Sequence, residues 1–168
     1  VLEDTQIDTF WCSRKQNCVY SKVIGRTTVL TRFDGQRGKR SEIVRYDGWP
    51  NWALSPDGSQ LAVVTNRNQG RIQIVSLKTG AGRDLVVKDW PVIRVAQWTA
   101  DGRSLLLTSF TAHGDSVVLD VDLQGKARVL LESPPNEMFY WAIPSPDGRY
   151  VALNVITGEE NVWMVENF

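Results

Sequence analysis

Catalytic or metal-binding chemistry in this 168-residue chain would depend on its single histidine, His113. A histidine can act as a general base or a zinc ligand, but a triad or a zinc site would have to be assembled around this one residue. The sequence contains neither a G-x-S-x-G nucleophile motif nor an H-E-x-x-H zinc motif. His113 lies in the polar stretch "TAHGDS", which is typical of an exposed loop. We therefore expect no catalytic residue, no metal and no cofactor.

The two cysteines, Cys12 and Cys18, flank the short stretch "SRKQN". If that stretch is a hairpin turn, the cysteines face each other on neighbouring strands at a separation that a disulfide can span. The alternative is that both are reduced thiols that pack as small hydrophobic residues. A bridge would indicate an oxidising compartment such as a periplasm, whereas reduced thiols would favour the cytoplasm.

Two tryptophans occupy matching places, Trp49 in "DGWP" and Trp90 in "DWP". Exposed tryptophan beside arginine is typical of recognition surfaces. The competing interpretation is structural, because a gap between packed sheets readily accepts a large aromatic side chain. The candidate face for a ligand or partner combines these tryptophans with loop residues expected on the same side: Trp49, Trp90, Asn66, Arg67, Asn68, His113, Asp115 and Glu159.

Three similar turns indicate which elements position these residues. The turns are "SPDG" at 55–58, "TADG" at 99–102 and "SPDG" at 145–148, so their glycines are 44 and 46 residues apart, a period typical of repeat architectures. Proline fixes φ for the second position of a type I turn, aspartate tolerates the third, and glycine supplies the positive φ of a hairpin bulge. The structural turn residues are Pro56, Asp57, Gly58, Asp101, Gly102, Pro146, Asp147 and Gly148.

Each turn is followed by a short apolar run, as in Leu61 to Val64, and then by an alternating segment, as in Arg71 to Val75. These patterns predict a central and a half-buried strand, and with the flanking strands they predict four antiparallel strands per repeat. The expected units are 4–47, 48–89, 90–132 and 133–168, the last without an outer strand, while 1–3 form the outer strand of a preceding or the last unit. The predicted fold class is an all-β propeller of four four-stranded blades, which is either part of a larger propeller or completed by a partner chain.

Composition excludes several classes of function. Nineteen basic and nineteen acidic residues cancel, and no cluster of Lys or Arg indicates direct nucleic-acid binding. No run of about 18 apolar residues indicates insertion into a membrane. The chain begins with Val1 instead of Met, and we interpret it as a segment of a longer protein.

The segments "WALSPDGSQLAVV", "VAQWTADGRSLLLTS" and "WAIPSPDGRYVALNV" resemble the WD40-like repeat of TolB-type β-propellers, which also occurs in propellers of the prolyl oligopeptidase group. The closing "NVWMVENF" further resembles the C-terminal propeller region of large bacterial sensor proteins. The resemblance covers essentially the whole chain. The "GH" and "WD" pairing of true WD40 repeats is missing, so the hydrogen-bonded network of that class is not expected.

The resemblance implies a non-catalytic sensory or protein-interaction module of a larger bacterial regulatory protein. Its partner would be a protein, a peptide or a small ligand. Two alternatives are the access-filtering propeller of a prolyl-oligopeptidase-like enzyme and a TolB-like periplasmic scaffold. For assembly we expect a homodimer that completes a propeller, or an open partial propeller, in preference to a closed four-bladed monomer.

Overall fold

The computed structural model describes residues 7–13, 16–34, 37–65 and 69–158. Within these ranges the chain forms antiparallel β-strands and no helix. This part of the chain therefore contains no membrane-spanning helix. The predicted all-β propeller class is confirmed.

Consecutive strands form four separate sheets, and each sheet follows the order of the sequence. Such an order needs only hairpin connections between neighbouring strands. The first sheet contains β1 (Ile7–Cys12), β2 (Asn17–Ile24), β3 (Thr27–Asp34) and β4 (Lys39–Asp47). The second contains β5 (Asn51–Leu54), β6 (Gln60–Val64), β7 (Arg71–Ser76) and β8 (Gly82–Val86). The third contains β9 (Ile93–Trp98), β10 (Ser104–Phe110), β11 (Ser116–Asp122) and β12 (Ala127–Glu132), and the fourth contains β13 (Glu137–Pro144) and β14 (Val151–Thr157).

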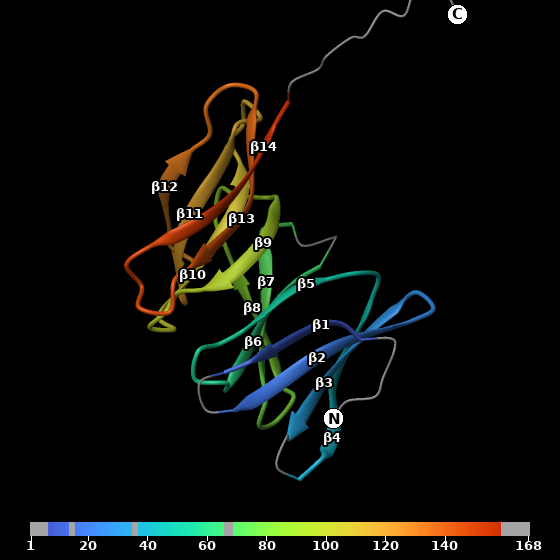
Figure 1. Ribbon diagram of the computed structural model, residues 1–168. Coiled ribbons are helices and arrows are strands. Elements are labelled where there is room, and N and C mark those ends of the chain that lie inside the picture. Colours follow the sequence, from blue (N-terminus) through green and yellow to red (C-terminus); the bar gives the residue numbers. More distant parts are fainter. Residues whose placement is uncertain (1–6, 14–15, 35–36, 66–68, 159–168) are drawn as a thin grey trace, which may run out of the picture.

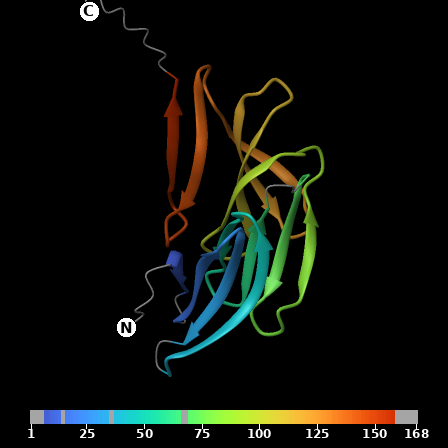
Figure 2. The ribbon, with the colours of Figure 1, turned by 90° about the vertical axis from the view of Figure 1, so that its right-hand side faces the viewer.

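The four sheets follow one another in an open, curved row, with the first sheet in the lower part and the last sheet in the upper part of both views (Figures 1 and 2). The outer strand expected at 1–3 and the third strand expected for the last unit, at 161–165, lie outside the described residues. The described strands therefore do not form a closed four-bladed ring.

Apolar side chains pack between successive sheets. The largest core joins the second and third sheets and includes Ile72, Ile74, Trp98, Leu105 and Leu107. The core between the first and second sheets is smaller, and the one between the third and fourth sheets contains only four fully buried residues, Leu106, Val118, Phe139 and Ala142. Burial thus decreases from the middle of the row toward the last sheet.

Hydrogen bonds fix the inner strands of neighbouring sheets against each other. The indole Nε1 of Trp98 donates to the carbonyl of Ala53 at 3.2 Å, and the backbone N–H of Ala96 donates to Asn51 Oδ1 at 3.0 Å. One sheet further, Thr108 Oγ1 donates to the carbonyl of Tyr140 at 3.1 Å. These contacts set the relative positions of β5, β9 and β13, the strands that form the candidate site.

The three repeated turns join the first and second strands of the second, third and fourth sheets. Gly58, Gly102 and Gly148 have φ angles of 71°, 69° and 73°, which is the left-handed region that glycine adopts without penalty. The N–H of Gly58 donates to the carbonyl of Ser55 at 2.8 Å, which closes the turn. The three glycines therefore have the positive φ that a hairpin turn at these places requires.

The carboxylates of the turn aspartates accept hydrogen bonds from backbone and hydroxyl groups of the same turn. The Asp101 carboxylate accepts the N–H of Arg103 at 3.1 Å and the hydroxyl of Thr99 at 2.8 Å, and these two bonds, in that order, lower the pKa of this carboxyl group. For Asp147 the hydroxyl of Ser145 and then the N–H of Arg149 lower the pKa. Both carboxylates therefore stabilise the turns in which they lie.

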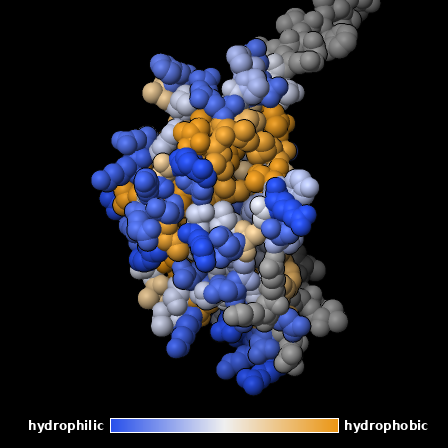
Figure 3. Space-filling view, turned by 90° about the vertical axis from the view of Figure 1, so that its left-hand side faces the viewer, coloured by the Kyte–Doolittle hydropathy of each residue, from blue (hydrophilic) through white to orange (hydrophobic). Residues whose placement is uncertain are grey.

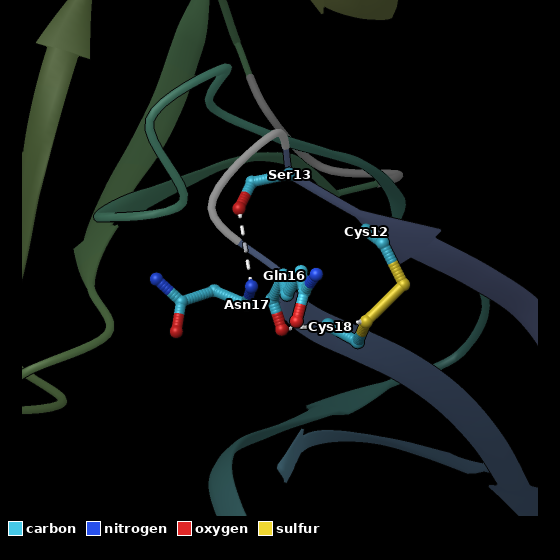
Figure 4. Close-up of a disulfide and its surroundings, with 5 residues drawn as sticks. All are labelled: Cys12, Ser13, Gln16, Asn17 and Cys18. Carbon is cyan, nitrogen blue, oxygen red and sulfur yellow. Dashed lines mark hydrogen bonds between the residues drawn. A yellow bond between two sulfur atoms is a disulfide. The ribbon is translucent and has the colours of Figure 1, made fainter. Parts of the chain in front are cut away.

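The corresponding turn of the first sheet has a different sequence and is stabilised in a different way. Gln16 has a φ of 60° at the place where the other turns have glycine, a conformation that costs a non-glycine residue free energy. Cys12 and Cys18 face each other next to this turn and form a disulfide with their Cα atoms 4.0 Å apart (Figure 4). Ser13 Oγ also accepts the N–H of Asn17 at 3.2 Å. Covalent linkage therefore holds the hairpin whose turn lacks the aspartate and glycine of the other repeats.

Candidate functional site

The two matching tryptophans have different surroundings. Trp49, in the connection between β4 and β5, is 64% exposed. Trp90, in the connection between β8 and β9, is half-buried and packs against the core between the second and third sheets. Trp49 therefore remains available for binding, whereas Trp90 has the wedge role that was the alternative interpretation for both residues.

The two other predicted face residues that the structure describes, His113 and Asp115, are not among those that line a pocket with Trp49. His113 and Asp115 lie in the loop between β10 and β11, where the backbone N–H groups of both donate to Thr111 Oγ1. Their contacts are those of a local turn, and the His113 side chain is exposed. Asn66, Arg67, Asn68 and Glu159 lie outside the described residues.

Trp49 instead lines a groove of about 410 Å³ at the inner strands of the second, third and fourth sheets. The groove lies where β5 and β9 begin and β6 ends, which is the face predicted for the connections and loops. Its lining combines aromatic, aliphatic and amide or hydroxyl side chains with one charged residue: Trp49, Asn51, Val64, Thr65, Val92, Ile93, Arg94, Val95, Tyr140 and Trp141.

Two of these residues occupy β-bulges at matching places in the repeat. In β9, Val95 pairs with Thr108 and Ile93 with Ser109, which leaves Arg94 as the extra residue. In β13 the same pattern leaves Tyr140 as the extra residue. Each lies eight residues before the glycine of the following turn. A bulge interrupts the alternation of side chains and re-aims them, and bulges are common beside functional sites.

The bulges bring Arg94 into an aromatic environment. Its guanidinium carbon lies over the ring of Tyr140, 5.2 Å from the ring centre, and over the ring of Phe110 at 5.5 Å. At these distances the electron-rich ring faces attract the cation. The rings of Tyr140 and Trp141 meet edge to face with centres 5.9 Å apart. Arg94 is thus held from two sides by side chains of neighbouring strands.

The charge of Arg94 is not neutralised locally. Among the described residues, its one side-chain hydrogen bond runs from Nη1 to the sulfur of Met138 at 3.6 Å, and a thioether is a weak acceptor. No carboxylate of the described ranges forms an ion pair with it. The corresponding bulge residue of the first sheet is Asp8, whose carboxylate accepts the hydroxyls of Thr9 and Ser21. Within the part of the chain that the structure describes, the positive charge of the groove is therefore uncompensated.

A second, smaller cavity of about 180 Å³ lies at the turn end of the inner strands. Trp11, Trp98 and Ile143 contribute apolar surface to it, and Gln97 is its one buried amide. Gln97 Nε2 is buried and has no hydrogen-bond partner in the part of the chain that the structure describes. The corresponding position in the other sheets is apolar, with Ala53 and Ile143 as examples.

The described residues of the site have features that are typical of binding surfaces: an exposed indole, further aromatic rings and an arginine. Across residues 7–13, 16–34, 37–65 and 69–158, no three His, Cys, Asp or Glu side chains gather in a way that could hold a metal ion. Sequence reasoning identified Trp49 but missed Arg94, Phe110, Tyr140 and Trp141. Alignment of the three turns would have placed Arg94 and Tyr140 at the same offset, but a bulge has no signature in strand alternation alone.

No protein-family model and no curated protein matches the sequence. Solved structures, however, include chains with a similar fold. TolB from Acinetobacter baumannii matches with a TM-score of 0.71 and 19% identity over 92% of this chain and 39% of its own. A TolB-type protein from Agrobacterium tumefaciens matches with a TM-score of 0.75 and 16% identity over 93% of this chain and 57% of its own.

A protease propeller is also similar. The β-propeller domain of the Trilobed protease from Pyrococcus furiosus, described as having an open velcro topology, matches with a TM-score of 0.55 and 17% identity over 89% of this chain and 53% of its own. The present chain therefore spans between about two fifths and three fifths of these proteins. Such similarity establishes architecture, and the chain has the β-propeller fold of the TolB type.

Proposed function

We propose that this segment is a non-catalytic binding module that recognises a protein or peptide partner at the groove beside Trp49. The observation that carries the proposal is the pairing of an exposed tryptophan with an uncompensated arginine on the inner strands of three packed sheets. Tryptophan and arginine are the residues that most often dominate the free energy of protein recognition. Strands that are fixed against each other lose little entropy on binding.

Selection of peptides from a displayed random library against the 168-residue chain tests this proposal. Selected peptides are expected to bind with a dissociation constant at least about tenfold weaker to the Trp49→Ala variant, because that side chain supplies exposed contact area. The His113→Ala variant is the matched control, since His113 is an exposed loop residue outside the groove. Binding that is equally strong in Trp49→Ala would place the partner elsewhere.

The absence of catalysis is tested separately. We expect the chain to give no turnover of peptide or ester substrates. Turnover that disappears on replacing one described residue, such as His113, would contradict the proposal. Similarity to a protease propeller favours a second candidate, in which the segment filters access to an active site on another domain. Under that candidate, a hydrolase domain would be encoded with this segment in the full open reading frame.

We also propose that a second copy of the chain covers the last sheet. Apolar residues are exposed at both ends of the row, with Ile156 at 46% and Phe10 at 45%. Two copies of a chain with four sheets could complete a ring of eight sheets as a two-fold dimer. Light scattering should give a dimer mass that falls to the monomer mass in Ile156→Asp. A strictly monomeric wild type would exclude this assembly.

An extracytoplasmic location is a further part of the proposal. The Cys12–Cys18 disulfide supports it, because such bonds persist in oxidising compartments and are rare in the cytosol. Whether the segment belongs to a regulatory protein depends on its neighbouring domains. A DNA-binding or kinase domain in the same open reading frame would support a sensor, and its absence would favour a scaffold.

A further inference from the structure

We propose that the groove binds an acidic side chain of an extended peptide, with Arg94 receiving the carboxylate and Trp49 and Trp141 contacting an adjacent apolar residue. The inference rests on the proposed function and specifies the chemistry of the partner. Three observations carry it: the placement of Arg94, its unused hydrogen-bonding capacity and the charge of the groove.

The placement of Arg94 follows from the backbone. Arg94 is the extra residue of a bulge, so its side chain is released from the strict alternation between the two neighbouring sheets. Tyr140 is the extra residue of the next inner strand, and its ring holds the guanidinium from the side of the fourth sheet. Phe110, at the end of β10, holds it from within the third sheet. The arginine is therefore positioned before any ligand arrives.

The guanidinium retains hydrogen-bond donors. A guanidinium carries five N–H groups in its plane, and aromatic rings that lie against it use none of these as conventional donors. Within the described part of the chain, the sulfur of Met138 is the one acceptor that its side chain contacts. A planar fork of N–H groups matches the two oxygens of a carboxylate, which accepts two parallel hydrogen bonds.

The charge of the lining selects the partner. Among the described residues that line the groove, Arg94 is the only charged one, and the other lining side chains are aromatic, aliphatic, amide or hydroxyl. A single arginine complements a single negative charge, whereas phosphate recognition typically recruits several donors or cations. Exposed indole surface beside the arginine favours an apolar neighbour of the acidic residue. An acidic residue next to an apolar one on an extended chain satisfies both requirements.

The test compares two capped octapeptides that differ in one central residue, glutamate or glutamine, flanked by leucine and tryptophan. Calorimetric titration into the intact chain should give a dissociation constant about tenfold or more lower for the glutamate peptide, as expected for charge-assisted hydrogen bonds. Arg94→Gln should abolish this discrimination, and Arg94→Lys should retain part of it. Arg103→Gln is the matched control, because Arg103 is an exposed arginine at the turn end of the same sheet.

Each outcome decides one proposal. If both peptides bind equally and Trp49→Ala weakens both, the carboxylate subsite is wrong and the binding function stands. If neither peptide binds and the library yields no peptide dependent on Trp49, both are wrong. Acetate alone should shift the NMR signal of Arg94 Nε only at concentrations far above those of the peptide. Acetate or inorganic phosphate that binds as tightly as the glutamate peptide would overturn the peptide as occupant.

Discussion

Strands β10 and β14 occupy the same place in their repeats, yet their environments are opposite. Both follow the repeated turn and both are apolar, with "SLLLTSF" in β10 and "VALNVIT" in β14. Leu107 of β10 is 0% exposed, whereas Leu153, its counterpart in β14, is only half-buried. β10 has a strand on each edge and a neighbouring sheet on each face, while β14 pairs with β13 alone among the described residues.

Figure 3 shows where the apolar side chains that are not covered by a neighbouring sheet lie on the surface. Apolar side chains gather in the upper half of that view, the half that β11 to β14 occupy in Figure 1. The large exposed apolar residues of this region are Val129, Leu130, Leu131, Ile143, Val151, Val155 and Ile156. Burial of a strand in this architecture is decided by its neighbours, and exposed apolar patches of this kind are typical of surfaces that another segment or chain covers.

The largest expected effect contrasts the two leucines. Leu107→Ala should lower the free energy of unfolding by about 3 to 4 kcal/mol, because it opens a cavity in the core between the second and third sheets. Leu153→Ala should cost about 1 kcal/mol, because its site is half-buried and can relax. Urea unfolding monitored by tryptophan fluorescence measures both. Equal costs would mean that β14 is covered as completely as β10 in solution.

A second contrast concerns the turns. A Cβ atom on Gly58 would lie 2.8 Å from the Cβ of Asn17, in addition to the unfavourable positive φ. A Cβ atom on Gly148, in the turn of the last sheet, would meet nothing closer than Ala100 at 3.4 Å. We expect Gly58→Ala to cost about 2 kcal/mol and Gly148→Ala about 1 kcal/mol. Thermal unfolding that ranks the two variants in the reverse order would contradict the packing of the first sheet against the second.

The disulfide distinguishes the two ends of the row. Reduction, or the pair Cys12→Ser and Cys18→Ser, should lower stability by roughly 2 kcal/mol, since the bridge closes a short loop in the unfolded chain. Mass spectrometry without reductant should show a peptide that links Cys12 to Cys18. Free alkylation of both thiols in protein purified under oxidising conditions would exclude the bridge.

The smallest expected effect concerns the pKa values of the turn aspartates, which should be lowered alike in the third and the fourth sheet. The pKa values of Asp101 and Asp147 lie below the ordinary value of 3.8, so each carboxylate contributes stability above that pH, and the contribution is lost as the pH falls through the lowered pKa. The cause is bonding within each turn, which does not depend on neighbouring sheets. NMR titration of the carboxyl carbons should therefore give similar lowered values for both, and a normal value for Asp147 alone would show that the last turn is not formed.

The repeated turns and most strands could be predicted from the sequence because their causes are local. Gly102 must adopt positive φ to form its turn, and Leu105 to Leu107 can be buried on both faces only as a central strand. The different roles of Trp49 and Trp90 could not be predicted, because exposure depends on how far each connection extends over the neighbouring sheet. Arg94 could not be predicted for a related reason. A one-residue bulge arises from the fit between neighbouring strands, and neither the composition nor the sequence pattern of β9 indicates it.

The open row of sheets also sets the order in which the molecule opens. The apolar cores of the described residues join successive sheets, so local stability behaves approximately as a sum of sheet terms and interface terms. Opening is then expected to begin at the smallest of these cores, the one between the third and fourth sheets, and to move inward. Backbone amides of β13 and β14 should exchange with solvent deuterium first, by fluctuations that leave the rest intact, whereas those of β6 and β10 should exchange only when the central pair of sheets separates. Tyr140 and Trp141 belong to the hairpin that is expected to exchange first, so the aromatic side of the groove lies on the sheet with the smallest core, beside an arginine carried by a sheet of the largest core.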